Sequence, residues 1–313
     1  MDRLTTFGSG AVLGGVAAAL YLVVLTGSPG ALLLVYLSQL PLFAAGLWLG
    51  IGAVLAAGIS GSTAVLLAGG WSAAALFVML NAAPAVLLVR QALLARTGPA
   101  GACEWYPPGL LTAWLTGFGV AALGAAIFYL GGPSGIETSL STMLTPALDQ
   151  FAETGGATRE ELMKMLALVT PGALATSWMV MTASNAILAQ GVLTRIGKAW
   201  RPSPDLAALT LPPWLFGFLV AGVALLMLGG SGRFVGVNLL IVLSVPFSLS
   251  GLAVLHTAAR RLQRPQIPLT VFYVVATLFG WPLLLVAVLG VLEMPLGLRR
   301  RLTPPGSFGG KIE

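Results

Sequence analysis

Apolar residues fill this chain in continuous blocks of about 20, and polar residues gather between the blocks. A helix of about 20 residues crosses the hydrocarbon core of a bilayer, so each block is a candidate membrane span. Strands of a membrane barrel alternate apolar and polar residues, and these blocks do not. The pattern predicts an all-α fold, a polytopic transmembrane helical bundle of about nine spans (roughly 8–10). The predicted spans are residues 8–25, 31–48, 50–68, 71–94, 110–130, 166–193, 211–228, 235–255 and 269–292.

The segment 31–69 leaves two arrangements open. Gly46, Gly50 and Gly52 supply a turn between two helices, and one long helix followed by a re-entrant segment fits the pattern as well. The span count above uses the two-helix arrangement.

The basic residues lie at the ends of the spans. Loops 195–209 and 256–268 hold an excess of Arg and Lys, as does loop 95–109 together with Arg90 at its rim. Loop 131–165 instead holds five carboxylates against two basic residues. The positive-inside rule places the three basic loops in the cytoplasm and the acidic loop outside. With nine spans, this assignment also predicts a cytoplasmic N-terminus.

The C-terminal end conflicts with that assignment. Arg299, Arg300 and Arg301 follow the ninth span, which should end outside. Either the span is interrupted at Gly280-Trp281-Pro282 and the chain returns, or the rule fails at this end. About 24 residues are too few for two full crossings. Both alternatives stay open.

Loop 131–165 carries an amphipathic pattern of its own. Its apolar residues recur at helical spacing, and Gly155-Gly156 separates two helical segments. We expect a helical hairpin on the outer membrane surface, acting either as a connector or as a lid over an outward cavity. Residues 1–302 then form a single integral membrane domain, and the Pro- and Gly-rich residues 303–313 form a disordered tail. The recurring apolar residues are Ile136, Leu140, Met143, Leu144, Leu148 and Phe151.

Charge is scarce throughout the chain. Asp, Glu, Lys and Arg make up 8% of the residues, against about 25% in soluble domains. None lies clearly in the middle of a predicted span, whereas proton-driven pumps usually need a buried titratable group there. The net charge of +6 comes from span ends, so we expect no nucleic-acid partner. The single cysteine, Cys103, excludes an internal disulfide, and we expect neither a metal nor a cofactor.

Neutral polar residues within the spans are the candidate ligand-binding groups. A face of Ser, Asn and Trp suits a pocket for a neutral, partly aromatic small molecule. In the alternative interpretation, each amide or hydroxyl bonds a neighbouring helix and stabilises the bundle. The candidates are Asn81, Ser177, Trp178, Ser184, Asn185 and Asn238, and Gln39 and Thr182 are further polar residues within spans.

Small residues form ridges that allow helices to touch backbone to backbone. Gly10, Gly14 and Ala18 repeat every four residues along the first span, and Gly15 and Ala19 repeat the spacing one residue on. Gly46 and Gly50 add two more small sites. We expect these helix-packing residues to serve internal contacts, with docking of a partner subunit as the alternative.

A serine protease interpretation rests on Gly58-Ile-Ser60-Gly61, a form seen in rhomboid-type intramembrane proteases, and on the only histidine, His256. A catalytic dyad needs both side chains at one depth, within hydrogen-bond reach. The predicted spans place Ser60 near mid-membrane and His256 at the cytoplasmic rim. We therefore predict that the chain is not an enzyme and has no catalytic residues.

Four segments resemble the YybS-like family of uncharacterised bacterial inner-membrane proteins: residues 40–50, Asn81-Ala-Ala-Pro84, residues 211–216 and residues 295–301. The acidic and aromatic residues that often precede the family's closing Arg are missing here, although Glu293 is near. The first part of that family is similar to the substrate-binding S components of energy-coupling-factor vitamin transporters. The resemblance implies vitamin binding within a helical bundle and docking on an energising module through small-residue faces. No S-component ligand motif is matched, so it assigns no binding residues.

These observations predict a multi-pass protein of the bacterial inner membrane that binds or transports a small molecule and depends on a partner for energy. A ligand-free scaffold or envelope assembly protein is the second hypothesis, and an intramembrane enzyme is the third. The expected partners are the lipid bilayer, a second membrane subunit and a neutral small molecule.

Overall fold

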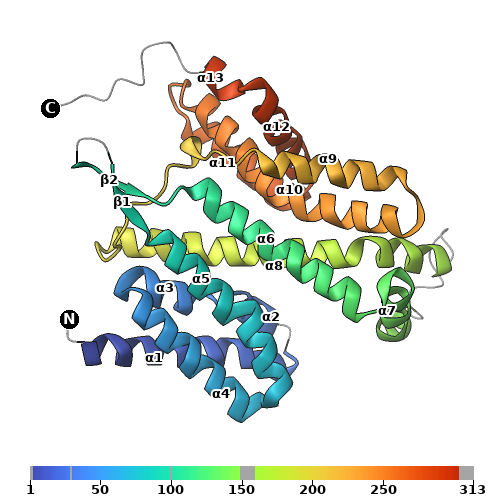
Figure 1. Cartoon of the computed structure of the whole chain (residues 1–313), viewed down its shortest axis with the longest axis horizontal. Helices are drawn as coiled ribbons and strands as arrows, with labels where there is room; N and C mark the ends of the chain where they lie inside the picture. Colours follow the sequence, from blue (N-terminus) through green and yellow to red (C-terminus); the bar gives the residue numbers. More distant parts are fainter. Residues whose placement is uncertain (1–2, 29, 99–100, 149–158, 303–313) are drawn as a thin grey trace. The chain divides into compact units, whose positions relative to one another are not determined.

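The computed structural model describes residues 3–28, 30–98, 101–148 and 159–302. Helices dominate these residues, so the prediction of an all-α helical bundle is confirmed. The contacts divide the chain into two units (Figure 1): unit 1 comprises Met1–Leu115 and Met179–Pro204, and unit 2 comprises Thr116–Trp178 and Asp205–Glu313. Helices α6 (Pro108–Tyr129) and α8 (Arg159–Arg195) are continuous across the division, and the single-domain interpretation stays a prediction. The predicted tail, 303–313, lies outside the described residues.

Unit 1 begins with helices that touch through small residues. Helix α1 (Arg3–Leu22) lies against the first part of α4 (Ile51–Phe77). A Cβ atom added at Gly10 or Gly14 would overlap the backbone of Ala53 or Ala57, so only glycine allows this approach. The remaining elements of unit 1 are η1 (Val23–Thr26), α2 (Ala31–Tyr36), α3 (Leu40–Leu49), the π-helical η2 (Val78–Ala82), α5 (Ala83–Ala92) and the two-stranded hairpin β1 (Ala95–Thr97) and β2 (Cys103–Trp105).

Two glycines set the helix breaks in this part of the chain. Gly50 has φ 90° and ends α3, so the segment 31–69 has the two-helix arrangement. Gly70 has φ 79° and ψ −178° within α4, a backbone conformation that is essentially restricted to glycine. Beyond Gly70 the chain folds back, since Gly58 faces Ala82 and Gly61 faces Phe77. The predicted boundary between residues 68 and 71 therefore falls at a real break.

Unit 2 packs around the long helix α10 (Gly230–Ala259). Gly251 of α10 touches the backbone of Val286, and Gly290 touches the backbone of Phe247. These glycines bring α10 and α12 into direct backbone contact. The other elements are α7 (Gly132–Leu148), η4 (Leu206–Ala208), α9 (Trp214–Met227), α11 (Gln266–Phe279), α12 (Pro282–Leu296) and α13 (Leu298–Leu302).

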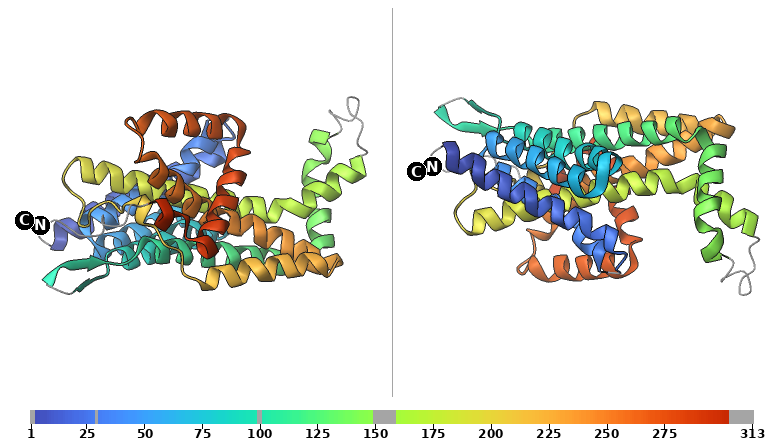
Figure 2. Two further views of the ribbon diagram at one scale, coloured as in Figure 1. Left: turned by 90° about the horizontal axis from the view of Figure 1, so that it is seen from above. Right: turned by 90° about the horizontal axis from the view of Figure 1, so that it is seen from below.

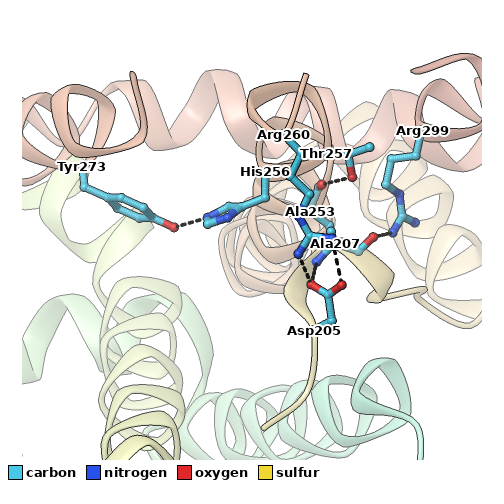
Figure 3. A network of polar contacts seen from close by, with 8 residues as sticks. All are labelled: Asp205, Ala207, Ala253, His256, Thr257, Arg260, Tyr273 and Arg299. Atoms are coloured by element: carbon cyan, nitrogen blue, oxygen red, sulfur yellow. Dashed lines mark hydrogen bonds and ion pairs between the residues drawn. The ribbon is translucent and has the colours of Figure 1, made fainter. Parts of the chain in front are cut away.

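The chain turns back between α11 and α12. Gly280 has φ 68°, and the two helices are bent by 119° relative to each other. The guanidinium of Arg299, beyond α12, donates to the carbonyls of Ala207 and Leu209. Asp205 in the same loop forms an ion pair with Arg260 at the end of α10 (Figure 3). The structure therefore has the first of the two alternatives: the last apolar block is interrupted, and Arg299 returns to the end that holds Arg260.

Within the part of the chain that the structure describes, six helices are long and apolar enough to cross a membrane, or up to seven when the bent pair α11–α12 is counted as one span. One of these six is the 42-residue segment Ile51–Ala92, although it folds back at Gly70. Helix α9 is apolar but shorter, with 14 residues, and is not among them. The count of about nine spans stays a prediction.

Helix α7 covers the first of the two helical segments that the sequence predicts in loop 131–165. Ile136 on this helix is buried against Ala167 and Phe234, with Leu140 beside them. The apolar side of α7 therefore packs against neighbouring helices of unit 2. The helix runs across the ends of α8 and α10 (Figure 2). The turn of the hairpin, 149–158, lies outside the described residues, and a place on the outer membrane surface stays a prediction.

Candidate functional site

The candidate site in unit 1 is built where two helices are interrupted. Residues 37–39 form a turn between α2 and α3. The π-helical η2 lies between the end of α4 and the start of α5 and interrupts the α-helical geometry there. Single π-helical turns occur frequently at functional sites. Pro84 follows η2 and has no N–H, so it cannot bond the carbonyl of Leu80 four residues earlier. Pro84 therefore supplies no donor to this carbonyl, and a donor from another element can take that place.

Gln39 supplies that donor. Its side-chain Nε2 donates to the Leu80 carbonyl at 2.6 Å, and the residue is 0% exposed. The neighbouring Ser38 hydroxyl donates to Oδ1 of Asn81 at 2.9 Å, and both residues are buried. These two bonds hold the turn at 37–39 against η2.

Asn185 of α8 approaches the same turn. Its Nδ2 donates to the Tyr36 carbonyl at 2.6 Å and to the Met181 carbonyl at 2.8 Å. The residue is 2% exposed. Ser38, Gln39, Asn81 and Asn185 therefore form one group around residues 36–39, called the polar cluster below.

Two oxygens of the polar cluster have no donor. Gln39 Oε1 and Asn185 Oδ1 are both buried and make no hydrogen bond. The amide orientations follow from the partners, since a backbone carbonyl accepts only and must face the NH2 side. A buried acceptor without a donor costs about 1–3 kcal/mol. The polar cluster thus offers two carbonyl oxygens to any group that carries N–H or O–H donors.

Asn238 has a different role in unit 2. Its Oδ1 accepts from the Gly172 N–H at 2.6 Å, and its Nδ2 donates to the Leu168 carbonyl at 2.8 Å. Those two backbone groups would otherwise bond each other within α8, beside Pro171. The Asn238 amide is inserted into the helical ladder and replaces that bond. Its Nδ2 also donates to the Phe234 carbonyl at 2.8 Å, so both ends of the amide take part in contacts within unit 2.

A family model described as a predicted membrane protein, DUF2232, matches residues 15–294. The chain belongs to the DUF2232 family. It is therefore a multi-pass integral membrane protein that contacts the lipid bilayer. Comparisons with curated proteins and with solved structures gave no match.

Among the residues that the sequence singles out in this DUF2232 chain, Asn81 and Asn185 come together at the polar cluster. Ser177 and Trp178 belong to unit 2 and are partly buried, and Ser184 is exposed. Sequence reasoning did not assign Ser38 or Gln39 to a site. Only part of the signal for Gln39 was available: Pro84 supplies no N–H to Leu80, but nothing local in the sequence connects Leu80 with Gln39.

The small residues of the predicted ridges fall into a buried group and an exposed group. Gly10, Gly14 and Ala18 are buried, whereas Gly15 and Ala19 on the next ridge are exposed. A Cβ at Gly46 would meet Val89 and Val54, and the ring of Trp200 covers Gly50. The first ridge therefore serves packing within unit 1, and the second has no contact of this kind among the described residues.

Ser60 and His256 each have other partners. The Ser60 hydroxyl donates to the Ala11 carbonyl at 2.9 Å and thereby joins α4 to α1. His256 Nε2 lies 2.9 Å from the Tyr273 hydroxyl (Figure 3). Beside it, hydrogen bonds from the Arg260 guanidinium hold the pKa of Asp205 below its usual value. These contacts link elements within each unit.

Proposed function

We propose that this DUF2232 protein binds a small neutral molecule at the polar cluster of unit 1, within the bilayer. The observation that carries the proposal is the pair of buried acceptors without donors, Gln39 Oε1 and Asn185 Oδ1. A ligand with N–H or O–H groups satisfies both oxygens and recovers the cost of burying them.

The chemistry of the cluster favours a neutral ligand. All four side chains are uncharged amides or hydroxyls, and the chain from residue 4 to residue 89 contains no Asp, Glu, Lys or Arg. A charged ligand would have no countercharge there, and burying it would cost on the order of several kcal/mol of lost hydration.

Transport by this chain then draws its energy from a partner subunit, as in the energy-coupling-factor S components that the sequence resembles. The proposal rests on the uncharged span interiors in the sequence, because ion-coupled transporters use intramembrane titratable groups. We further propose that the protein is not an enzyme, and that it lies in a bacterial inner membrane with a cytoplasmic N-terminus.

A ligand-free scaffold is the second candidate function. It is favoured by Asn238, whose amide bonds two backbone groups of α8 and the Phe234 carbonyl of its own helix, and by the Ser38–Asn81 bond. In a scaffold, a buried water would supply the donors for Gln39 and Asn185.

Native mass spectrometry of the purified protein separates these functions. We compare the wild-type chain with Asn185→Leu, which removes one free acceptor, and with Ser184→Ala, an exposed neighbour on the same helix. A binder retains a small-molecule mass in the wild type and in Ser184→Ala and loses it in Asn185→Leu. A panel of neutral vitamins, each added in excess, is then scored by thermal shift. If no mass is retained and no panel member raises the melting temperature, the scaffold function replaces the binder.

A further inference from the structure

Among the described residues of unit 1, the charged ones all lie at one end of the unit. The segment 4–89 and residues 179–194 contain none. The charges sit at the start of α1, the end of α5, the β1–β2 hairpin and the loop after α8. They are Arg3, Arg90, Arg96, Glu104, Arg195, Lys198 and Arg201. Glu104, their single carboxylate, is paired with Arg96, so this end carries a strong positive excess.

Arg201 fixes the backbone of this end. Its guanidinium donates to the carbonyl of Ala92, the last residue of α5, at 2.9 Å and to the carbonyl of Tyr106 at 3.4 Å. The residue is 6% exposed, and burial lowers the pKa of its guanidinium from the ordinary value. None of the ion pairs found among the described residues includes Arg201. Arg201 therefore adds an unneutralised positive charge to this end of unit 1.

Exposed cations and an exposed tryptophan lie close to Arg201 in the chain, at the same end of unit 1. The Lys198 ammonium lies 4.3 Å from the centre of the Trp48 ring, a cation–π contact that holds it at this end. Arg195 is exposed one turn earlier, and Trp200 is 61% exposed. Tryptophan and basic residues together are typical of the level of the lipid headgroups.

An apolar stripe leads from these cations along α8. Leu188 and Val192 lie on one face of α8, and Ile196, directly after its last residue, continues the four-residue spacing. They are 49%, 57% and 54% exposed. The face therefore joins an exposed hydrocarbon surface to a cluster of positive charge, and this combination matches the two halves of a phospholipid.

We propose that this surface, made of Arg195, Lys198 and Trp200 with the stripe Leu188, Val192 and Ile196, binds an anionic phospholipid. The phosphate lies against the two exposed cations, and an acyl chain covers the stripe. The charge excess selects an anionic headgroup over a zwitterionic one. The stripe selects a membrane lipid over a free phosphate, which has nothing to place on it.

The test is a lipid titration of the whole purified protein, read by native mass spectrometry, with phosphatidylglycerol and phosphatidylcholine as probes. The variants are Lys198→Gln, Arg195→Gln and the double variant. Lys164→Gln is the matched control, since it removes the same charge at the other end of α8, where Lys164 is paired with Glu160. Each lost cation should weaken phosphatidylglycerol binding about fivefold, and the double variant about 25-fold. Phosphatidylcholine binding and the control should stay unchanged.

Three results would overturn the proposal. Equal affinity of the wild type for the two lipids removes the charge selection. An equal loss in Lys164→Gln makes the effect one of net charge alone. Competition by inorganic phosphate at equal concentration assigns the surface to a soluble anion instead. None of these outcomes depends on the polar cluster, so this proposal and the proposed function fail separately.

Discussion

At the residue scale, an uncharged amide buried among apolar helices is used in two ways in this protein. Asn238 has both ends bonded to α8, and Asn185 has its NH2 group bonded and its oxygen free. The two residues look alike in the sequence, each an Asn within an apolar block. Their difference comes from Pro171, which interrupts α8 beside Asn238 and opens backbone groups that the amide then fills.

Replacement of Asn238 by Leu should destabilise the protein by about 1–3 kcal/mol. The Gly172 N–H and the Leu168 carbonyl lose their partner in an apolar interior, where water cannot replace it. The measurement is reversible unfolding in detergent micelles, with Ser184→Ala as the control. Equal stability of Asn238→Leu and wild type would show that α8 closes its own ladder without the amide.

Adjacent glycines of α1 offer a second residue-scale test. A Cβ at Gly14 would overlap the Ala57 carbonyl and the Ser60 hydroxyl, and a Cβ at Gly15 would meet nothing. Gly14→Ala should therefore lower stability by about 1–3 kcal/mol through overpacking. Gly15→Ala should leave stability unchanged or raise it slightly, because Ala favours the helix. Melting temperatures of the two purified variants decide the matter, and a larger loss in Gly15→Ala would contradict the assigned ridge.

At the element scale, the positions of helix breaks are the part of the fold that the sequence predicts well. The pair Gly69-Gly70 separates two apolar blocks, and Gly70 indeed has a conformation that favours glycine. The packing of the resulting helices is harder to predict. Gly251 touches α12 and Gly290 touches α10, yet neither belongs to a ridge of small residues repeated every four positions. The two helices come this close at a single crossing, so no repeat is needed. Likewise, Gln39 and Leu80 are 41 residues apart, so no local pattern connects them.

The end of α12 is held by a buried ion pair. Arg299 Nε lies 2.8 Å from Glu293 Oε1, and the two side chains are 15% and 8% exposed. Arg299→Gln should destabilise the protein by roughly 3–5 kcal/mol, because Glu293 is left as an unpaired buried charge. The double variant Glu293→Gln/Arg299→Gln should recover part of that loss. Unfolding of the two single variants and the double variant gives the coupling energy, and strictly additive effects would exclude a functional ion pair here.

At the scale of the whole molecule, composition alone predicts the class of protein. Continuous apolar blocks and only 8% charged residues indicate a helical membrane protein. The matching family is likewise described as a membrane protein family. The sidedness of the C-terminal end is different, since it depends on one bend at Gly280 that composition does not reveal. The sequence indicates this bend only indirectly, because the positive charge of Arg299, Arg300 and Arg301 conflicts with the positive-inside rule for an uninterrupted ninth span.

The bend makes a prediction for the topology of the complete protein. Because the chain reverses at Gly280 and Arg299 bonds the loop beside Arg260, positions 264 and 300 should lie on one side of the membrane. In a Cys103→Ser background, Arg264→Cys and Arg300→Cys should react with an impermeant maleimide from the cytoplasmic side. Met143→Cys, in the acidic segment, should react from the outside and serves as the contrasting site. Labelling of position 300 from the same side as position 143 would mean that α11 and α12 together cross the bilayer, and that the positive-inside rule fails at this end.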